Sequence, residues 1–304
     1  MKKAVKIENL SHQYADGTVS LENISLEIKE GERIAILGQN GAGKTTLFLH
    51  LNGSIKSSED NVYIFGKNVK TMPISERIHK VGVFFQDPDD QLFMPTIYDD
   101  VAFGPSNMGL SQSEIKKRVK KALATVGLSG FEDRVPHHLS YGQKKRAALA
   151  TVLAMKPKIL VLDEPTANLD PKNRAIIIGL INELNRDLGI TTIVAMHDVN
   201  AVSQLADRVF VLNKTIVAGG TPHEIFSDNN MLKENNLEAP EVYKLFKILE
   251  CYDCKCKCPP LAMTDVPDVV DSLFDETGGK VQLCKDEKTS DKVASLLGRF
   301  NYYF

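Results

Sequence analysis

The first 250 residues contain no cysteine, and all five cysteines of the chain lie at or after Cys251. A disulfide-stapled secreted domain is therefore not expected, and the cytosol is the simplest compartment. Long apolar runs are also missing. The best ones, residues 159–162 and 176–178, are far shorter than the roughly 20 residues of a membrane-spanning helix. The N-terminal residues 1–9 lack the apolar core of a signal peptide. A role at a membrane would need separate membrane subunits.

An excess of positive charge is missing too. The chain has 37 Lys and Arg against 39 Asp and Glu, a formal net charge of -2, so nucleic acid is not an expected partner. The content of apolar residues, 43%, and of charged residues, 25%, is that of a soluble globular protein. A length of 304 residues suffices for one large or two modest domains.

Strand and helix patterns alternate along most of the chain and predict an α/β domain with a largely parallel central sheet. Two N-terminal segments alternate apolar and polar residues and are expected to be β-rich, at 5–10 and 21–28. The expected strands are 33–37, 159–163 and 191–196, followed by a hairpin over 209–218. The expected helices run from the glycine-rich loop to about residue 52, and over 111–126, 140–154, 171–187 and 241–249. Ser111 and Glu114 are predicted to form a capping box, and residues 227–230 and 234–236 a loop.

A glycine-rich segment after the first apolar strand fits the phosphate-binding P-loop. Its glycines let backbone N–H groups face a phosphate, and the following helix directs its positive end to the same anion. The lysine is expected to reach the β- and γ-phosphates of ATP, and the first threonine to bind Mg²⁺. A glycine-rich turn with an incidental lysine is the alternative, which the full motif disfavours. The segment, with the next residue, is Gly38, Gln39, Asn40, Gly41, Ala42, Gly43, Lys44, Thr45 and Thr46.

Two carboxylates follow the apolar strand at 159–163. The carboxyl ends of parallel strands form the edge of a sheet where ligands bind. Asp163 is therefore predicted to serve the Mg²⁺ site and Glu164 to act as the general base for an attacking water. A surface Asp-Glu pair is the alternative, and the P-loop upstream argues against it.

A third motif, residues 139–143, lies between the P-loop and the acidic strand. Ser140 and Gln143 are predicted to form a capping box, which leaves a helix N-terminus free to meet a phosphate. Together with Gly142, these residues resemble the signature of ATP-binding-cassette ATPases. The resemblance implies a head-to-tail dimer, a homodimer or a heterodimer, in which this helix end contacts ATP held by the other subunit. An ordinary helix start is the alternative.

Other elements of that family occur in the expected order. Tyr14 resembles the aromatic residue that stacks on adenine, and Gln86 the Q-loop glutamine that senses the γ-phosphate and contributes to the Mg²⁺ site. Residues 167–170, ending in Asp170, resemble the D-loop, and His197 the switch histidine of hydrolysis. The implied fold is a P-loop core with a mixed, largely parallel sheet, an N-terminal antiparallel β subdomain and a helical subdomain. Taken singly, Tyr14 could be a packed loop aromatic and His197 an ordinary strand-end histidine.

The Q-loop region, residues 85–93, and Tyr141 of the signature resemble the ATPases of energy-coupling-factor importers, particularly the cobalt/nickel type. This resemblance implies a transmembrane coupling subunit, a substrate-binding membrane subunit, and a peripheral place on the cytoplasmic face of the cell membrane. Asp89, Asp90 and Gln91 are expected to help dock the coupling subunit, unless they form a solvated acidic loop. A vitamin or another ion is the alternative cargo.

Cassette ATPases of other classes fit less well. A DNA-repair or chromosome-structure ATPase would carry a long coiled coil between P-loop and signature, and a translation factor would carry two cassettes. Neither is visible in this sequence. An inactive cassette is disfavoured because Lys44, Asp163, Glu164 and His197 are all present.

A change of composition at Cys251 divides the chain into a predicted ATP-binding domain, 1–250, and a small cysteine-rich extension, 251–304. Cys251, Cys254, Cys256 and Cys258 are close enough in sequence to bind one soft metal ion, with Cys284 as a further candidate ligand. A regulatory metal site is the hypothesis, and a cluster of reduced thiols without a ligand is the alternative. Residues 259–304 are expected to form a helix, a short strand and a helix.

Overall fold

The computed structural model describes residues 2–55, 61–254, 256–276, 281 and 283–300. Its centre is a six-stranded sheet of order β10-β9-β3-β8-β7-β6, in which only β10 runs antiparallel to its neighbour. The predicted mixed, largely parallel sheet is confirmed. The strands are β3 Arg33–Leu37, β6 Val81–Phe84, β7 Ile159–Asp163, β8 Thr191–Met196, β9 Arg208–Asn213 and β10 Thr215–Gly220.

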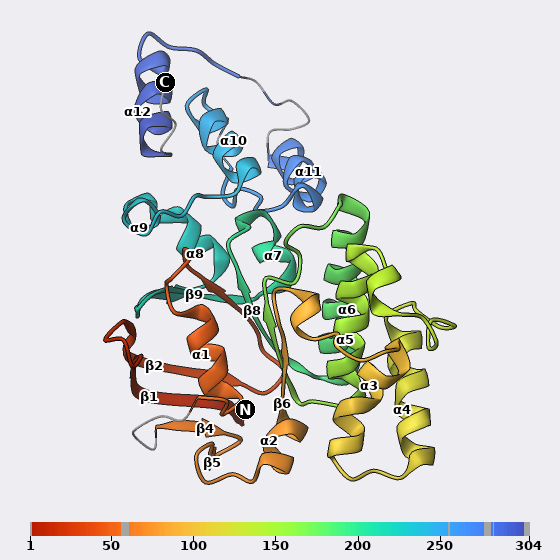
Figure 1. Ribbon diagram of the computed structural model, residues 1–304. Coiled ribbons are helices and arrows are strands. Elements are labelled where there is room, and N and C mark those ends of the chain that lie inside the picture. The colour runs from red at the N-terminus through yellow and green to blue at the C-terminus, as the bar shows by residue number, and fades with distance from the viewer. Residues whose placement is uncertain (1, 56–60, 255, 277–280, 282, 301–304) are drawn as a thin grey trace.

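A second, antiparallel sheet of order β2-β1-β4-β5 forms the N-terminal β subdomain (Figure 1). Its strands are β1 Lys3–Gln13, β2 Val19–Lys29, β4 Val62–Ile64 and β5 Lys67–Asn68. Helix α1, Lys44–Leu51, packs in one hydrophobic cluster with residues from both sheets, because Leu47 and Phe48 are almost fully buried there. The P-loop at the start of α1 is thereby placed between the two sheets.

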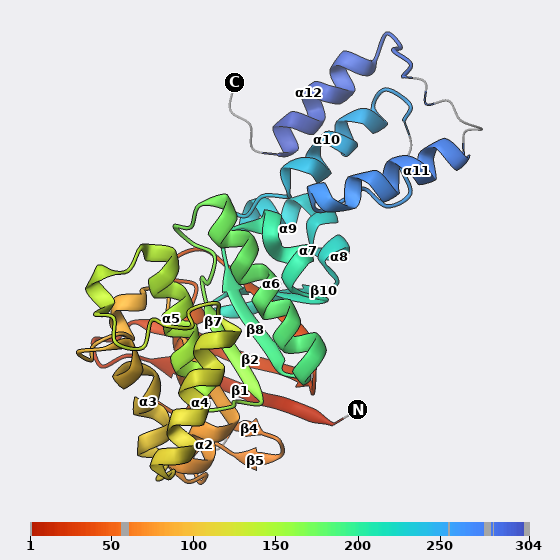
Figure 2. The ribbon, with the colours of Figure 1, turned by 90° about the vertical axis from the view of Figure 1, so that its right-hand side faces the viewer.

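The helical subdomain consists of α3, Ile97–Asn107, α4, Gln112–Thr125, and α5, Tyr141–Ala154, which pack against one another (Figures 1 and 2). The other helices that precede β9 are α2 Ile74–Lys80, α6 Pro171–Leu188 and α7 Val202–Leu205. The capping box predicted at α4 is only half formed. Ser111 accepts from the backbone N–H of Glu114, but the Glu114 carboxylate pairs with Arg118, one turn further along the helix.

Further helices follow β10 in the described part of the chain. They are α8 Pro222–Ser227, α9 Asn229–Glu234, α10 Glu241–Glu250, α11 Val266–Glu276 and α12 Thr289–Arg299. Helices α10, α11 and α12 lie at the end of the molecule opposite α2 and β5 (Figures 1 and 2). The loops predicted at 227–230 and 234–236 were wrong in part, because Ser227 belongs to α8 and residues 229, 230 and 234 belong to α9. Asp228 caps α9 by accepting from the N–H of Met231, and burial of Met231 and Leu232 stabilises this short helix.

Helix α10 contacts both parts of the predicted two-domain division. Its Tyr243 joins the large core, whereas its Val242 and Phe246 form a small cluster with Cys254 and Leu273 of the extension. The boundary at residue 251 stays a prediction. The strand expected between α11 and α12 does not occur in residues 281 and 283–288, and 277–280 and 282 lie outside the described residues. Within the described part of the chain, no helix combines the length and apolarity needed to span a membrane.

Candidate active site

The P-loop and the carboxyl end of β7 meet in one pocket of about 470 Å³, within the usual size range of small-molecule sites. It is lined by Tyr14, Thr18, Val19, Ser20, Gln39, Asn40, Gly41, Ala42, Gly43, Lys44, Thr45, Thr46, Gln86, Asp163, Glu164 and Lys214. Gly38 lines an adjoining pocket, which also includes His197. The structure therefore brings together the predicted P-loop, Q-loop and acidic-strand residues, which are far apart in sequence.

The conformation of the P-loop depends on glycine at its last turn. Gly43 has a φ of 101°, in the left-handed region, and a Cβ there would lie 2.5 Å from the carbonyl oxygen of Ser20. Next to it, the ammonium of Lys44 donates to the carbonyl oxygens of Gly38 at 2.5 Å and Gln39 at 3.2 Å. Burial lowers the pKa of Lys44, an effect opposed by the charges of Glu164 and Asp163. The buried lysine is thus held against the P-loop backbone, where it lines the pocket.

Thr45 and Asp163 are in direct contact. The Thr45 hydroxyl donates to Oδ2 of Asp163 at 2.8 Å, and burial raises the pKa of that carboxyl group. Gln86 lines the same pocket. A hydroxyl, a carboxylate and an amide oxygen are the hard donors that Mg²⁺ prefers, so these three residues fit the predicted magnesium site.

Glu164 is held by several partners at the end of β7. Its side chain is only 6% exposed, and its Oε2 lies 2.8 Å from Nδ1 of His197, the residue that follows the neighbouring strand β8. The two residues meet because β7 and β8 are adjacent parallel strands whose carboxyl ends share one edge. A carboxylate paired with an imidazole can accept a proton and orient a water.

Tyr14 lies beside the P-loop helix. Its hydroxyl shares a 2.9 Å hydrogen bond with Thr46, and its side chain is half-exposed at 41%. Ser20 donates to the same Thr46 hydroxyl at 2.8 Å. The aromatic ring is therefore at the mouth of the pocket, where the predicted contact with a base could form.

Comparison with known proteins agrees with this geometry. A family model for ABC transporters matches residues 21–167. The chain is 50% identical to an energy-coupling factor transporter ATP-binding protein, EcfA, of Methanothermobacter thermautotrophicus, over 81% of this chain and 79% of that one. An EcfA of Methanococcus maripaludis is also 50% identical, over 82% and 90%.

The chain belongs to the ATP-binding-cassette transporter family.

Within that family it groups with the energy-coupling-factor ATPases. Among solved structures, CbiO1 of Clostridium perfringens, described as part of the ABC transporter complex CbiONQ, has a TM-score of 0.68 at 43% identity, over 78% of this chain and 95% of that one. A dimeric cassette, MJ0796, bound to ADP and phosphate has a TM-score of 0.65 at 30% identity, over 72% and 98%. The cassette fold predicted from the sequence is confirmed.

The signature residues of this cassette lie apart from its own nucleotide pocket. Ser140 caps α5 by accepting from the N–H of Gln143, and the Gln143 side chain accepts from the N–H of Ser140, so this predicted capping box is confirmed. Gly142 packs against Asn173, whose N–H is in turn bonded to Asp170, the cap of α6. None of these residues lines the pocket that contains Lys44.

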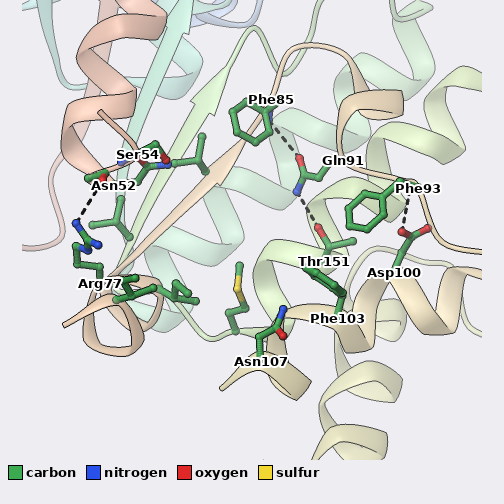
Figure 3. Close-up of a pocket in the computed structure, with 17 residues that line it drawn as sticks. Asn52, Ser54, Arg77, Phe85, Gln91, Phe93, Asp100, Phe103, Asn107 and Thr151 are labelled. Atoms are coloured by element: carbon green, nitrogen blue, oxygen red, sulfur yellow. Dashed lines mark hydrogen bonds between the residues drawn. The ribbon is translucent and has the colours of Figure 1, made fainter. Parts of the chain in front are cut away.

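A second pocket, of about 450 Å³, lies between the cassette core and the helical subdomain (Figure 3). Its lining is mostly apolar, and three large side chains remain exposed there: Ile74 at 66%, Phe93 at 61% and Phe103 at 42%. The two phenyl rings meet edge to face at 5.2 Å. An exposed apolar cluster with a polar border is typical of a surface that binds another protein.

Gln91 lines this second pocket but points inward. Its side-chain NH₂ donates to the hydroxyl of Thr151 at 2.7 Å and to the carbonyl oxygen of Ala148 at 3.0 Å. Asp89 instead pairs with Lys144 of the signature helix at 2.7 Å, and neither Asp89 nor Asp90 lines the pocket. Docking by these three residues stays a prediction.

Sequence reasoning missed part of the nucleotide pocket. Ser20, on β2, and Lys214, in the turn between β9 and β10, line it without belonging to any motif. The backbone N–H of Lys214 donates to the carbonyl oxygen of Ala42 at 2.9 Å. Only the pairing of distant strands brings these residues to the P-loop, so the sequence carried no signal for them.

The predicted thiolate metal site is not supported. No group of three or more His, Cys, Asp or Glu side chains among the described residues is arranged to hold a metal ion. Cys254 is buried in the small apolar cluster, whereas Sγ of Cys258 lies 3.2 Å from Nε2 of His223 on α8. Cys251 and Cys256 are half-buried, and Cys284 is exposed. The close spacing in sequence therefore does not bring three metal-ligating side chains together within the described part of the chain.

Proposed function

We propose that this chain is the ATP-hydrolysing motor of an energy-coupling-factor importer for a transition-metal ion, cobalt or nickel. One observation supports the proposed ATP hydrolysis: the P-loop and the carboxylates at the end of β7 share a pocket, and the imidazole of His197 contacts the carboxylate of Glu164. The cargo is supported by the resemblance of residues 85–93 and Tyr141 to the cobalt/nickel type and by the likeness to CbiO1. An importer of a vitamin or another ion is the alternative.

The proposed hydrolytic role of each residue follows from its contacts. When ATP binds, the Lys44 ammonium gives up its hydrogen bonds to the P-loop carbonyl groups and binds the oxygens of the β- and γ-phosphates instead. Thr45, Asp163 and Gln86 would hold Mg²⁺, which neutralises phosphate charge when bound. Glu164 accepts a proton from the attacking water, and His197 orients the Glu164 carboxylate.

The proposed working unit is a head-to-tail dimer, with an identical or a paralogous second ATPase. Ser140, Gly142 and Gln143 form the N-terminus of α5 outside their own pocket, with Ser140 exposed and Gly142 buried. Backbone N–H groups at such a helix end can bind an anion. They are proposed to contact the γ-phosphate of the partner, with Asp170 nearby in the D-loop. The dimeric form of the similar cassette MJ0796 supports this arrangement.

The second pocket, which Phe93 lines, is the proposed docking groove for the transmembrane coupling subunit, on the cytoplasmic face of the membrane. Besides its exposed apolar residues, it contains Asp100, which accepts from the N–H groups of Phe93 and Met94 through Oδ1. The other oxygen, Oδ2, is buried and has no hydrogen-bond partner among the described residues.

Co-purification from membranes followed by uptake measurements tests the proposal. Cells that express the chain with its membrane subunits should accumulate cobalt or nickel, and the Glu164→Gln variant should not. Accumulation of a vitamin alone would refute the proposed cargo but keep the importer. Failure to recover any membrane subunit would refute the importer itself.

A further inference from the structure

One lysine of the signature helix is fully buried. Lys145 is 0% exposed, although its neighbours Lys144 and Arg146 are only half-buried. Its ammonium donates to the backbone carbonyl oxygen of Glu164 at 2.8 Å. A buried charge is costly unless it has partners, so its position is set by the groups around it.

Two aromatic rings lie close to the buried ammonium of Lys145. The Lys145 ammonium lies 5.5 Å from the ring centroid of Phe84, at the end of β6 just before the Q-loop. It lies 5.8 Å from the ring of Tyr141, in the signature itself. Both distances fit cation–π contacts. Lys145 therefore connects the signature, the start of the Q-loop and the acidic strand within one subunit.

The backbone of Glu164 needs this support. Its φ of 48° lies in the left-handed region, which is unfavourable for a residue with a side chain and persists only where surrounding contacts enforce it. The Glu164 N–H donates to the carbonyl oxygen of Ala195 at 3.0 Å. The Glu164 carbonyl oxygen accepts from the N–H of Ala167 at 3.2 Å and, at a shorter distance, from Lys145. Lys145 is thus the one side chain among the described residues that donates to this peptide unit.

We propose that Lys145 is a positioning residue for ATP hydrolysis, which holds the Glu164 carboxylate in place and ties it to the signature turn at Tyr141. When the α5 N-terminus moves against ATP held by a partner, Lys145 would move with it and shift the position of Glu164 in the same subunit. The inference rests on the proposed role of Glu164 as general base. Lys145 touches neither water nor nucleotide in this scheme and acts only through the Glu164 backbone.

The charge of Lys145 gives this role a pH dependence. Burial lowers the pKa of Lys145 to about 8, while Glu164, Asp87 and Asp163 oppose that shift. As pH rises through this value, the ammonium loses its proton and the bond to the Glu164 carbonyl weakens, since charged donors form the stronger hydrogen bonds. Hydrolysis should therefore decline above about pH 8 in the wild type, and variants without an amine should lack this step.

The first test compares Lys145→Met with Lys120→Met by measuring kcat and the Kd of ATP. Lys120 is an exposed lysine of α4 and has no ion pair within the described ranges. We expect kcat of Lys145→Met to fall by about 10- to 100-fold, the scale of a misplaced catalytic group, with an unchanged Kd. Lys120→Met should match the wild type. A kcat within threefold of wild type, or a loss confined to ATP binding, would overturn the proposal.

Lys145→Gln covers the case in which the methionine variant does not fold. Its amide keeps an N–H donor without a charge, so we expect intermediate kcat and no alkaline step near pH 8. A wild-type alkaline step in a folded Lys145→Gln variant would overturn the proposal.

A double variant separates a positioning role from a general structural one. If Lys145 acts through Glu164, then Lys145→Met should cause no further loss of single-turnover hydrolysis in a Glu164→Gln background. An equal fold loss in both backgrounds would overturn the proposal. Near-normal turnover of Glu164→Gln alone would instead refute the general-base role, so the two failures are distinguishable.

Discussion

The imidazole of His197 and the carboxylate of Glu164 are joined by a 2.8 Å contact between Nδ1 and Oε2. The histidine side chain is 61% exposed, whereas the glutamate side chain is 6% exposed. His197 therefore approaches the buried carboxylate from the solvent side, where ATP and the attacking water would enter.

Replacement of His197 by alanine should remove this constraint without affecting the P-loop. We expect phosphate release to fall by about 10- to 100-fold, with an ATP Kd close to wild type. Stopped-flow phosphate release and fluorescent-nucleotide binding measure the two quantities. His79→Ala, an exposed histidine on α2, is the control. Equal activities of the two variants would contradict the proposed role of His197.

The P-loop offers a matched pair of glycines. Gly43 has a φ of 101° and no room for a Cβ, which would lie 2.5 Å from a backbone oxygen, whereas Gly41 has a φ of 81° and nothing within 4 Å. Gly43→Ala combines strain with a clash and should weaken ATP binding by roughly tenfold or more. Gly41→Ala carries the strain alone and should weaken it less. Titration with fluorescent ATP measures the Kd of both variants. If Gly41→Ala weakens ATP binding as much as Gly43→Ala or more, the lack of space around Gly43 is unimportant.

Acid should destabilise the protein partly through His50 on α1. This residue is 1% exposed, and neither of its ring nitrogens has a hydrogen-bond partner among the described residues. Burial, together with the charge of His12, lowers the pKa of His50 from 6.5 to about 4. The folded state thus keeps His50 neutral while the unfolded chain binds a proton. Its contribution to stability is complete above about pH 6.5 and is lost as pH falls toward about 4.

His50→Leu should therefore show a smaller fall in melting temperature between those pH values than the wild type. Exposed His137→Leu should keep the wild-type pH dependence. Identical pH profiles for His50→Leu and the wild type would exclude His50 as a source of acid lability.

The groove at Phe93 should matter for assembly and not for chemistry. Phe93→Ser removes an exposed aromatic side chain from the lining of this pocket. It should reduce capture of the membrane subunits while ATP hydrolysis by the isolated chain stays unchanged. Leu188→Ser, on the exposed end of α6, is the control for loss of an exposed apolar residue. If both variants copurify with membrane subunits like the wild type, the groove is not the docking site.

Strands buried on both faces were the most predictable elements. β3, β7 and β8 were predicted with the bounds that the structure has, because an interior parallel strand is a continuous apolar run with a sharp end. Helix α9 was missed because its asparagine-rich sequence is typical of a loop, and only packing of Met231 and Leu232 against the core decides its conformation.

Within the site, motif residues were predictable and their supports were not. Lys145 lies in a run of three basic residues that is typical of an exposed helix face, so its sequence gives no sign of burial. Its contact with Glu164 depends on how α5 packs against β7. The cysteine cluster is the converse case. Four thiols within eight residues suggest a shared metal ion, but the described residues include no group of three ligands arranged to hold one.

Glu164 is the proposed general base of the ATP hydrolysis that drives transport. Comparison of ATP binding and phosphate release by the wild type and by Glu164→Gln tests this role most directly. We expect an ATP Kd close to wild type and a loss of about two to four orders of magnitude in phosphate release. Near-normal phosphate release by Glu164→Gln would contradict this role.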